Sequence, residues 1–184
     1  PRMQLDSLSG EVAWELEPGG AFLVRLPSLS FANPDLAGSA FGNYRWTGEG
    51  PGVLDLSAQL SRADGRRTAK YLPLSSIMGP TTRGWLETAI VAGSVKDARL
   101  RIKGDLRDFP FTDPAKGQFQ IAAKVGAGVL DYVSGWPRID HIEADLLFER
   151  ERMEIVGRGG AILGARVGAT RVSIANLLTP DPRL

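Results

Sequence analysis

Polar and apolar residues alternate along most of this chain with a period of two, the pattern of strands that bury one face. The clearest runs of this kind are 98–106, 118–125, 142–149 and 153–158. In each run the apolar and the charged residues occupy opposite faces. Shorter strands are expected at 161–163 and 166–174, so the C-terminal half is predicted to be a set of half-buried strands.

The N-terminal third shows the same pattern. Further strands are predicted at 3–8, 11–17, 21–31, 38–47 and 52–62. Short stretches rich in Gly, Pro, Asn and Asp separate them, and such stretches form turns. Short connections join antiparallel strands, because parallel pairing needs a long crossover. We therefore expect a mainly β fold, an antiparallel meander forming a curved or grooved sheet, either taco-like or an open sandwich.

One short helical insert interrupts the strands. Its apolar residues share one helical face, and Thr81 or Thr82 can cap its start while Gly93 can end it. The residues on that face are Trp85, Leu86, Ala89 and Ile90. A shorter helical turn is predicted at 66–71. The expected organisation is one β-rich segment, 1–184, with strands at 1–65, a helical insert at 66–93 and strands at 94–175.

The amino-acid composition excludes several kinds of functional site. The 184 residues include no Cys and one His, so neither a thiolate site nor a two-histidine metal site can form. The net charge of +1 gives no electrostatic footprint for nucleic acid. His141 is read as a surface strand residue, because no activated nucleophile accompanies it. We expect no catalytic residue, metal or cofactor.

Three other features allow a functional and a structural interpretation. Glu143 and Asp145 could form a carboxylate pair for glycoside hydrolysis, but the alternation places them on the solvent-facing side. Two glycine-rich pieces, 48–52 and 157–160, match hairpin turns better than phosphate-binding loops. A basic stripe at 96–107 could bind anionic lipid headgroups or RNA. We expect it instead to pair with the acidic stripe at 140–151 within one sheet.

Several motifs together resemble the YhdP family, a branch of the AsmA-like proteins of Gram-negative bacteria. The matching pieces are 60–65 (LSRADG), 71–73 (YLP), 85–86 (WL) with Ala89, Ile90 and Gly93, 104–111 (GDLRDFPF), 117–119 (GQF), 130–132 (LDY) and 135–137 (GWP). They extend over roughly residues 30–175, and the piece at 104–111 is the most specific.

This resemblance implies a function and a location. Proteins of this family are very large, are anchored in the inner membrane and span the periplasm. They are similar to bridge-like lipid transfer proteins, with a long curved sheet whose concave face is apolar. The resemblance implies phospholipid transport between the inner and outer membranes, and hence outer-membrane integrity. We expect this chain to be an internal periplasmic segment, with the membrane reached through regions outside it.

The expected partners are phospholipid acyl chains, with no nucleic acid. The residues expected to line the lipid groove are Leu100, Ile102, Leu106, Phe119, Ile121, Val125, Leu146, Phe148, Met153 and Ile155. The helix carrying Trp85, Leu86, Ala89 and Ile90 is expected to plug or cover part of the same face. Two alternatives stay open: a non-catalytic structural or interaction module with a closed core, and a glycan hydrolase that uses acidic residues.

Overall fold

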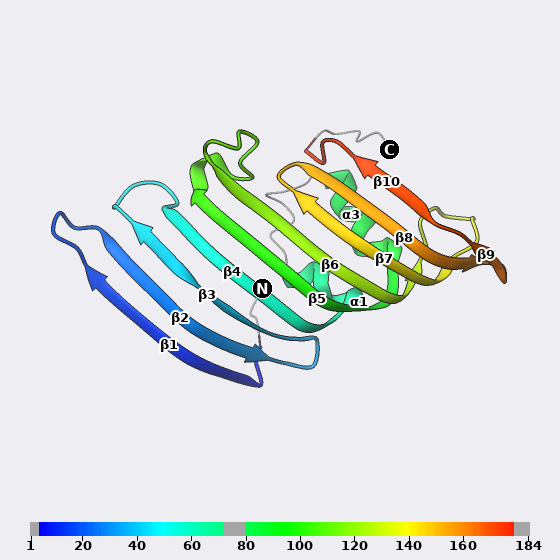
Figure 1. Cartoon of the computed structure of the whole chain (residues 1–184), viewed down its shortest axis with the longest axis horizontal. Helices are drawn as coiled ribbons and strands as arrows, with labels where there is room; N and C mark the ends of the chain where they lie inside the picture. Colours follow the sequence, from blue (N-terminus) through cyan, green and yellow to red (C-terminus); the bar gives the residue numbers. More distant parts are fainter. Residues whose placement is uncertain (1–3, 72–79, 179–184) are drawn as a thin grey trace.

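The computed structural model describes residues 4–71 and 80–178 and shows one antiparallel sheet of ten strands (Figure 1). The strands are β1 (Ser7–Leu16), β2 (Phe22–Ala32), β3 (Leu36–Trp46), β4 (Val53–Asp64), β5 (Ile90–Asp105), β6 (Gly117–Leu130), β7 (Ile139–Glu149), β8 (Arg152–Ile162), β9 (Ala165–Val167) and β10 (Thr170–Ile174). Neighbours in sequence are neighbours in the sheet from β1 to β8. The short β9 and then β10 both pair with β8. The predicted antiparallel meander is confirmed.

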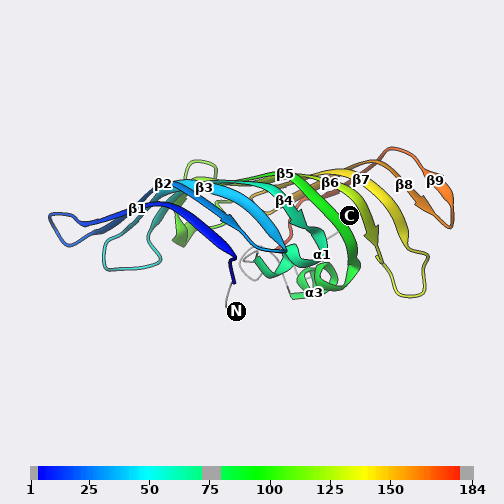
Figure 2. The ribbon, with the colours of Figure 1, turned by 90° about the horizontal axis from the view of Figure 1, so that it is seen from below.

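The sheet is open and not closed into a barrel or a sandwich. Its outermost strands are β1, which pairs with β2, and β10, which pairs with β8. Seen from below, the sheet arches over its helical pieces, which therefore lie on its concave side (Figure 2). The pieces under the arch are α1 (Gly65–Thr68), η1 (Ala69–Tyr71) and α3 (Pro80–Ala89), which belong to the connection from β4 to β5.

Several predicted element boundaries are wrong. The runs 3–8 and 11–17 form a single strand, β1, because Gly10 stays extended and pairs with Leu29 of β2. Met3 lies outside the described residues. The helix ends at Ala89, and Ile90 already belongs to β5 and pairs with Leu130 of β6. A β-branched Ile–Val pair favours the strand there, and this preference outweighs the helical spacing.

Gly93 does not end the helix but lies inside β5. Its φ of 149° accompanies two register shifts between β5 and β6 at this point. At the far end of β5 the predicted alternation stops one residue early, because Leu106 begins a 3-10 turn, η2 (Leu106–Asp108). The Asp105 carboxylate accepts a hydrogen bond from the Arg107 backbone amide at 2.9 Å and so caps this turn.

The strand register places the apolar residues of neighbouring strands side by side on one face. Ile102 of β5 lies opposite both Leu56 of β4 and Phe119 of β6, and the same face continues to Phe148 and Met153. This face is the concave one, because Tyr71 of η1 packs against its residues. The apolar face predicted by the alternation therefore forms one surface shared by the strands of the sheet.

Ion pairs between neighbouring strands cover the convex face. Arg101 of β5 pairs with Asp55 of β4, and Arg158 of β8 pairs with Asp145 of β7 at 3.0 Å. The predicted pairing between the basic and the acidic stripe is wrong, because β6 lies between β5 and β7. Each stripe finds other partners: Lys103 pairs with Asp55 of β4 at 3.7 Å, and Asp145 pairs with Arg158 of β8. The charges are thus paired locally, as is usual on a solvated face.

Candidate lipid-binding face

All ten residues predicted to line a lipid groove lie along the concave side of the C-terminal half of the molecule. Nine are on strands: Leu100, Ile102, Phe119, Ile121, Val125, Leu146, Phe148, Met153 and Ile155. Leu106 is on η2. The register brings them together in cross-strand pairs such as Leu100 with Ile121 and Leu146 with Ile155. Eight of the ten are half-buried, whereas Phe119 and Met153 are buried.

Residues of the chain itself cover Phe119 and Met153. Phe111, which follows η2, and Leu177, which follows β10, are both fully buried in one cluster with them. The Phe111 ring lies against a cross-strand glycine pair, Gly104 of β5 and Gly117 of β6. A Cβ atom on Gly117 would lie 2.5 Å from the ring, so the absence of side chains at the pair makes room for it. This end of the concave face is an ordinary packed core.

The concave face of the N-terminal strands is different, because large apolar side chains stay exposed there. The exposed fractions are 61% for Leu8, 69% for Trp14 and 73% for Leu16, all on β1. Val12, Phe22 and Trp46 are also exposed. Surface patches of this kind, unlike single exposed apolar residues, commonly mark binding sites.

No charged residue points to the concave face from β1, β2 or β3. The register, together with the alternation along β1 for Val12, assigns to it Leu8, Gly10, Val12, Trp14, Leu16, Phe22, Val24, Leu26, Leu29, Phe31, Leu36, Gly38, Ala40, Gly42, Tyr44 and Trp46. Charged residues of the same strands, such as Glu15 and Arg25, pair with each other on the opposite face at 2.7 Å. The sequence prediction missed this part of the face, although the alternation along 8–16 already carried the signal.

The predicted helical plug is only partly as expected. Helix α3 lies on the concave side, and Ala89 at its end is buried (Figure 2). Trp85 is 38% exposed and its indole Nε1 donates a hydrogen bond to the Tyr132 carbonyl oxygen at 2.9 Å. Ile90 belongs to β5, and the side chain of Leu86 lies outside the described residues. Thus Trp85 ties the helix to the loop between β6 and β7.

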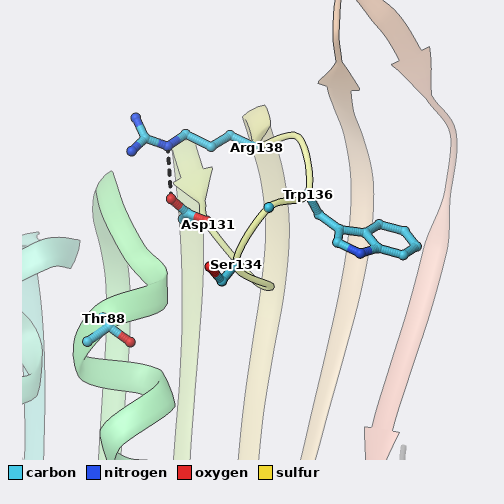
Figure 3. A pocket seen from close by; sticks show the side chains of 6 residues that line it. Thr88, Asp131, Ser134, Trp136 and Arg138 are labelled. Atoms are coloured by element: carbon cyan, nitrogen blue, oxygen red, sulfur yellow. Dashed lines mark hydrogen bonds and ion pairs between the residues drawn. The ribbon is translucent and has the colours of Figure 1, made fainter.

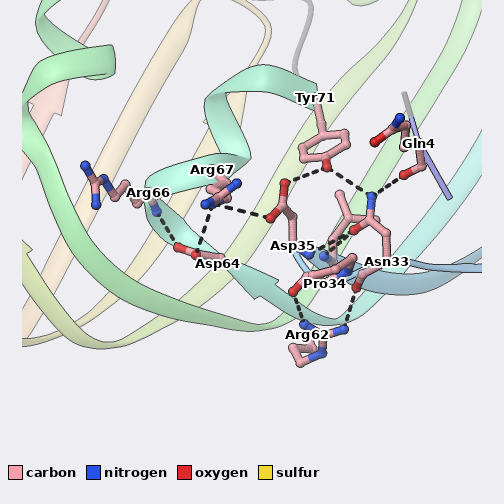
Figure 4. Close-up of polar contacts among 10 residues, drawn as sticks. Gln4, Asn33, Pro34, Asp35, Arg62, Asp64, Arg66, Arg67 and Tyr71 are labelled. Atoms are coloured by element: carbon pink, nitrogen blue, oxygen red, sulfur yellow. Dashed lines mark hydrogen bonds and ion pairs between the residues drawn. The ribbon is translucent and has the colours of Figure 1, made fainter. Parts of the chain in front are cut away.

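A buried hydrogen-bond network fixes α1 and η1 to the turn between β2 and β3 (Figure 4). The Asn33 side chain is buried, and its Nδ2 donates to the Tyr71 hydroxyl at 3.0 Å and to the Gln4 carbonyl at 2.8 Å. The Tyr71 hydroxyl donates in turn to Asp35 Oδ2 at 2.8 Å. Burial and this hydrogen bond to Asp35 raise the pKa of Tyr71 above its usual value. The helical turns therefore have a fixed place at one end of the concave face.

A polar recess of about 380 Å³ lies between the end of α3 and the loop from β6 to β7 (Figure 3). Thr88, Asp131, Ser134 and Arg138 line it, and Arg138 Nε is 3.1 Å from Asp131 Oδ2. The Trp136 side chain points away from the other labelled residues. Among the described residues that line the recess there is one carboxylate, which is already paired, whereas glycoside hydrolysis uses two facing carboxylates.

Other candidates for chemistry are scattered over the described part of the chain. His141 is exposed near the start of β7, and Glu143 accepts a hydrogen bond from the Ala127 backbone amide. Within residues 4–71 and 80–178, no group of three or more acidic or histidine side chains could hold a metal ion. No described helix has the length and apolarity needed to cross a membrane.

The comparison with known families identifies the chain as a whole. The family model described as "YhdP protein" matches residues 1–184. No curated protein and no solved structure matches the chain. The family match agrees with the resemblance found in the sequence motifs and extends it beyond residues 30–175 to both ends. Because the model spans the full sequence, the chain belongs to the YhdP family.

Proposed function

We propose that this chain is a periplasmic segment of an AsmA-like lipid transport protein and that its concave face carries phospholipid acyl chains. The observation that supports this most is the uncharged, exposed concave face of β1–β3, with Leu8, Trp14 and Leu16 mostly open to solvent. Each methylene group that such a surface buries contributes about 0.8 kcal/mol. Acyl chains therefore supply the association energy without any directional contact.

The shape of the sheet also favours lipid over a folded protein partner. The ribbon curves toward the side that carries the helices, so the apolar surface of β1–β3, here called the trough, lies on the inside of this curve. Its apolar stripe along β1 runs from Leu8 to Leu16, about 27 Å at roughly 3.4 Å per residue. One leaflet of a bilayer is about 15 Å of hydrocarbon. A stripe of this length holds an extended acyl chain lying along the strand.

In this proposal the segment is not an enzyme, because transfer of lipid along a surface breaks no covalent bond. The whole protein is anchored in the inner membrane by regions outside this chain, and it moves phospholipid between the two membranes and so maintains the outer membrane. These roles rest on membership of the YhdP family. Within the chain, the trough is the lipid-carrying part of the concave face, and the Phe111–Leu177 core closes the other end of that face.

The alternative of a structural module rests on that packed core. Phe111, Phe119 and Leu177 are almost fully buried, as in a non-binding β domain. The same packing does not extend to β1, whose apolar side chains are exposed. A purely structural role therefore does not account for the exposed apolar face, whereas lipid binding does.

The test is to purify the chain and analyse bound phospholipid by organic extraction and native mass spectrometry. We expect bound phospholipid in the unmodified chain and its loss when Trp14→Glu and Leu16→Glu are combined, since two charges then lie in the trough. Phe41→Glu is the matched control, because Phe41 is also exposed but lies on the convex face. The proposal fails if the unmodified chain takes up no phospholipid from mixed vesicles, or if the control loses as much as the double variant.

A further inference from the structure

We propose that Trp14 and Trp46 orient the phospholipid in the trough, with its headgroup beside these two side chains and the ends of its acyl chains toward Leu36. This inference rests on the proposed function and deepens it, because it adds the direction in which the lipid lies. Trp14 and Trp46 are near the turns that end β1 and β3, whereas Leu36 is at the opposite end, where β4 leads into α1 (Figure 1).

Amphipathic aromatic side chains gather at one end of the trough. Trp14 of β1 and Tyr44 of β3 both lie opposite Val24 of β2, and Trp46 is two residues beyond Tyr44 on the same face. Trp14 is 69% exposed and Trp46 is 40% exposed, so both rings are open to a ligand. Toward Leu36 the trough carries aliphatic residues, glycine and one Phe, none of which has a polar side-chain atom. The two ends of the trough therefore differ in polarity.

Hydrogen bonds fix two of these rings with their polar atoms toward the turn between β3 and β4. Trp46 Nε1 donates to the Gly50 carbonyl oxygen at 3.0 Å, and the Tyr44 hydroxyl donates to the Pro51 carbonyl oxygen at 3.0 Å. Within residues 4–71 and 80–178, the indole Nε1 of Trp14 has no hydrogen-bond partner. It can therefore donate to an ester or phosphate oxygen of a lipid.

The chemistry of these side chains indicates where the polar part of an amphiphile lies. Trp and Tyr combine an apolar ring with a polar donor, and in membrane proteins they gather at the level of the lipid headgroups. From Leu8 to Trp14, β1 advances six residues, about 20 Å at roughly 3.4 Å per residue. One bilayer leaflet has about 15 Å of hydrocarbon. A lipid with its headgroup beside Trp14 therefore has room for its acyl chains along the strand.

The opposite end of the trough suits the ends of the acyl chains. Leu36 is 4% exposed and belongs to an apolar cluster against which Tyr71 of η1 packs. The cation near this end, Arg67, already has two carboxylates beside its Nε, Asp35 Oδ1 at 3.4 Å and Asp64 Oδ2 at 3.9 Å. Its charge is therefore compensated within the chain, and the aromatic end is the better place for the headgroup.

The experiment uses the lack of Cys in the sequence, which allows one fluorescent bimane label per variant. Leu16→Cys and Leu8→Cys carry the label at the two ends of β1, and Phe41→Cys carries it on the convex face. Each labelled chain is loaded from vesicles with a phospholipid that bears a nitroxide quencher either on its headgroup or at the end of one acyl chain. Size-exclusion chromatography then separates the chain from the vesicles, so that quenching reports only lipid bound to the chain.

We expect the headgroup nitroxide to quench the label on Leu16→Cys more than the label on Leu8→Cys, and the acyl-chain nitroxide to do the reverse. The label on Phe41→Cys stays unquenched with either lipid. Combining Trp14→Leu with Trp46→Leu keeps apolar side chains at both positions, so lipid still binds, but the difference between the two ends is lost.

The matched control is Trp85→Leu with Trp136→Leu, which removes two tryptophans outside β1–β3 and keeps the difference. Equal quenching at the two ends of β1, or quenching in the reverse order, overturns the orientation but leaves the lipid-binding trough standing. An undiminished difference in the combined Trp14→Leu and Trp46→Leu variant overturns the role of these side chains. Absence of bound phospholipid, or quenching as strong on Phe41→Cys as on Leu16→Cys, contradicts the proposed function itself.

Discussion

At the scale of residues, a few side chains decide which part of the concave face is closed. The glycine pair Gly104–Gly117 leaves space for Phe111, and Phe111 covers Phe119. This arrangement depends on a contact between a loop and two strands. The alternation along each strand predicts which side chains share a face, but it does not predict that a following loop folds back onto that face.

Replacing Phe111 by Ala tests this closure. We expect Phe111→Ala to lower the free energy of unfolding by about 3–5 kcal/mol, because a fully buried aromatic side chain is removed from a packed cluster. Urea denaturation followed by circular dichroism measures the change. Phe41→Ala is the control, and its effect should be within about 0.5 kcal/mol since Phe41 is 59% exposed. Equal effects of the two variants would contradict the packed core at this end.

The Asp105 carboxylate gives a pH dependence with a definite sign. Hydrogen bonds from the Arg107 side chain and backbone lower its pKa from 3.8 to about 2. A folded-state pKa below the unfolded value stabilises the protein above about pH 4, and this contribution is lost as the pH falls toward 2.

The matched variant for this pH dependence is Asp105→Asn, because its side-chain oxygen can still accept the backbone hydrogen bond of the turn. We expect the urea midpoint of the unmodified chain to exceed that of the variant at pH 6. The difference should shrink between pH 4 and pH 2. A difference that stays constant over this interval would show that the Asp105 charge does not stabilise the folded state.

At the scale of elements, the sequence predicts the strands better than the helices. Strands β5–β8 were predicted from their alternation, and the helical turn at 66–71 is confirmed as α1 and η1. The end of α3 was predicted wrongly because Ile90 fits both a helical face and a strand. Ile90 belongs to a strand because it pairs with Leu130, forty residues away, and no local sequence pattern contains that information.

The network at Tyr71 holds the helical turns in place, so its loss should loosen them. Tyr71→Phe removes the hydroxyl that connects Asn33 and Asp35 and leaves the buried Asn33 amide without that partner. We expect a loss of about 1–3 kcal/mol in stability. Hydrogen–deuterium exchange should become faster at residues 65–71. Tyr44→Phe is the control, because the Tyr44 hydroxyl bonds the Pro51 carbonyl in an exposed place. Unchanged exchange in Tyr71→Phe would contradict the anchoring role.

At the scale of the whole molecule, the two faces of the sheet have separate chemistry. Ion pairs between strands cover the convex face, and an uncharged surface lines the concave face of β1–β3. The sequence predicts the apolar face and the antiparallel order. It does not predict which part is covered, because exposure depends on the arch of the sheet and on loops such as 109–111. For this reason the predicted lining residues lay in the C-terminal half, while the exposed apolar side chains are on β1–β3.

The most direct test of the account is photo-crosslinking of the purified chain mixed with vesicles of phosphatidylethanolamine and phosphatidylglycerol. A photoreactive amino acid is placed at Leu16 on the concave face or at Phe41 on the convex face, two positions of comparable exposure. Mass spectrometry then detects phospholipid adducts. The account predicts adducts at Leu16 and few or none at Phe41. Equal labelling at the two positions, or no labelling at Leu16, would contradict it.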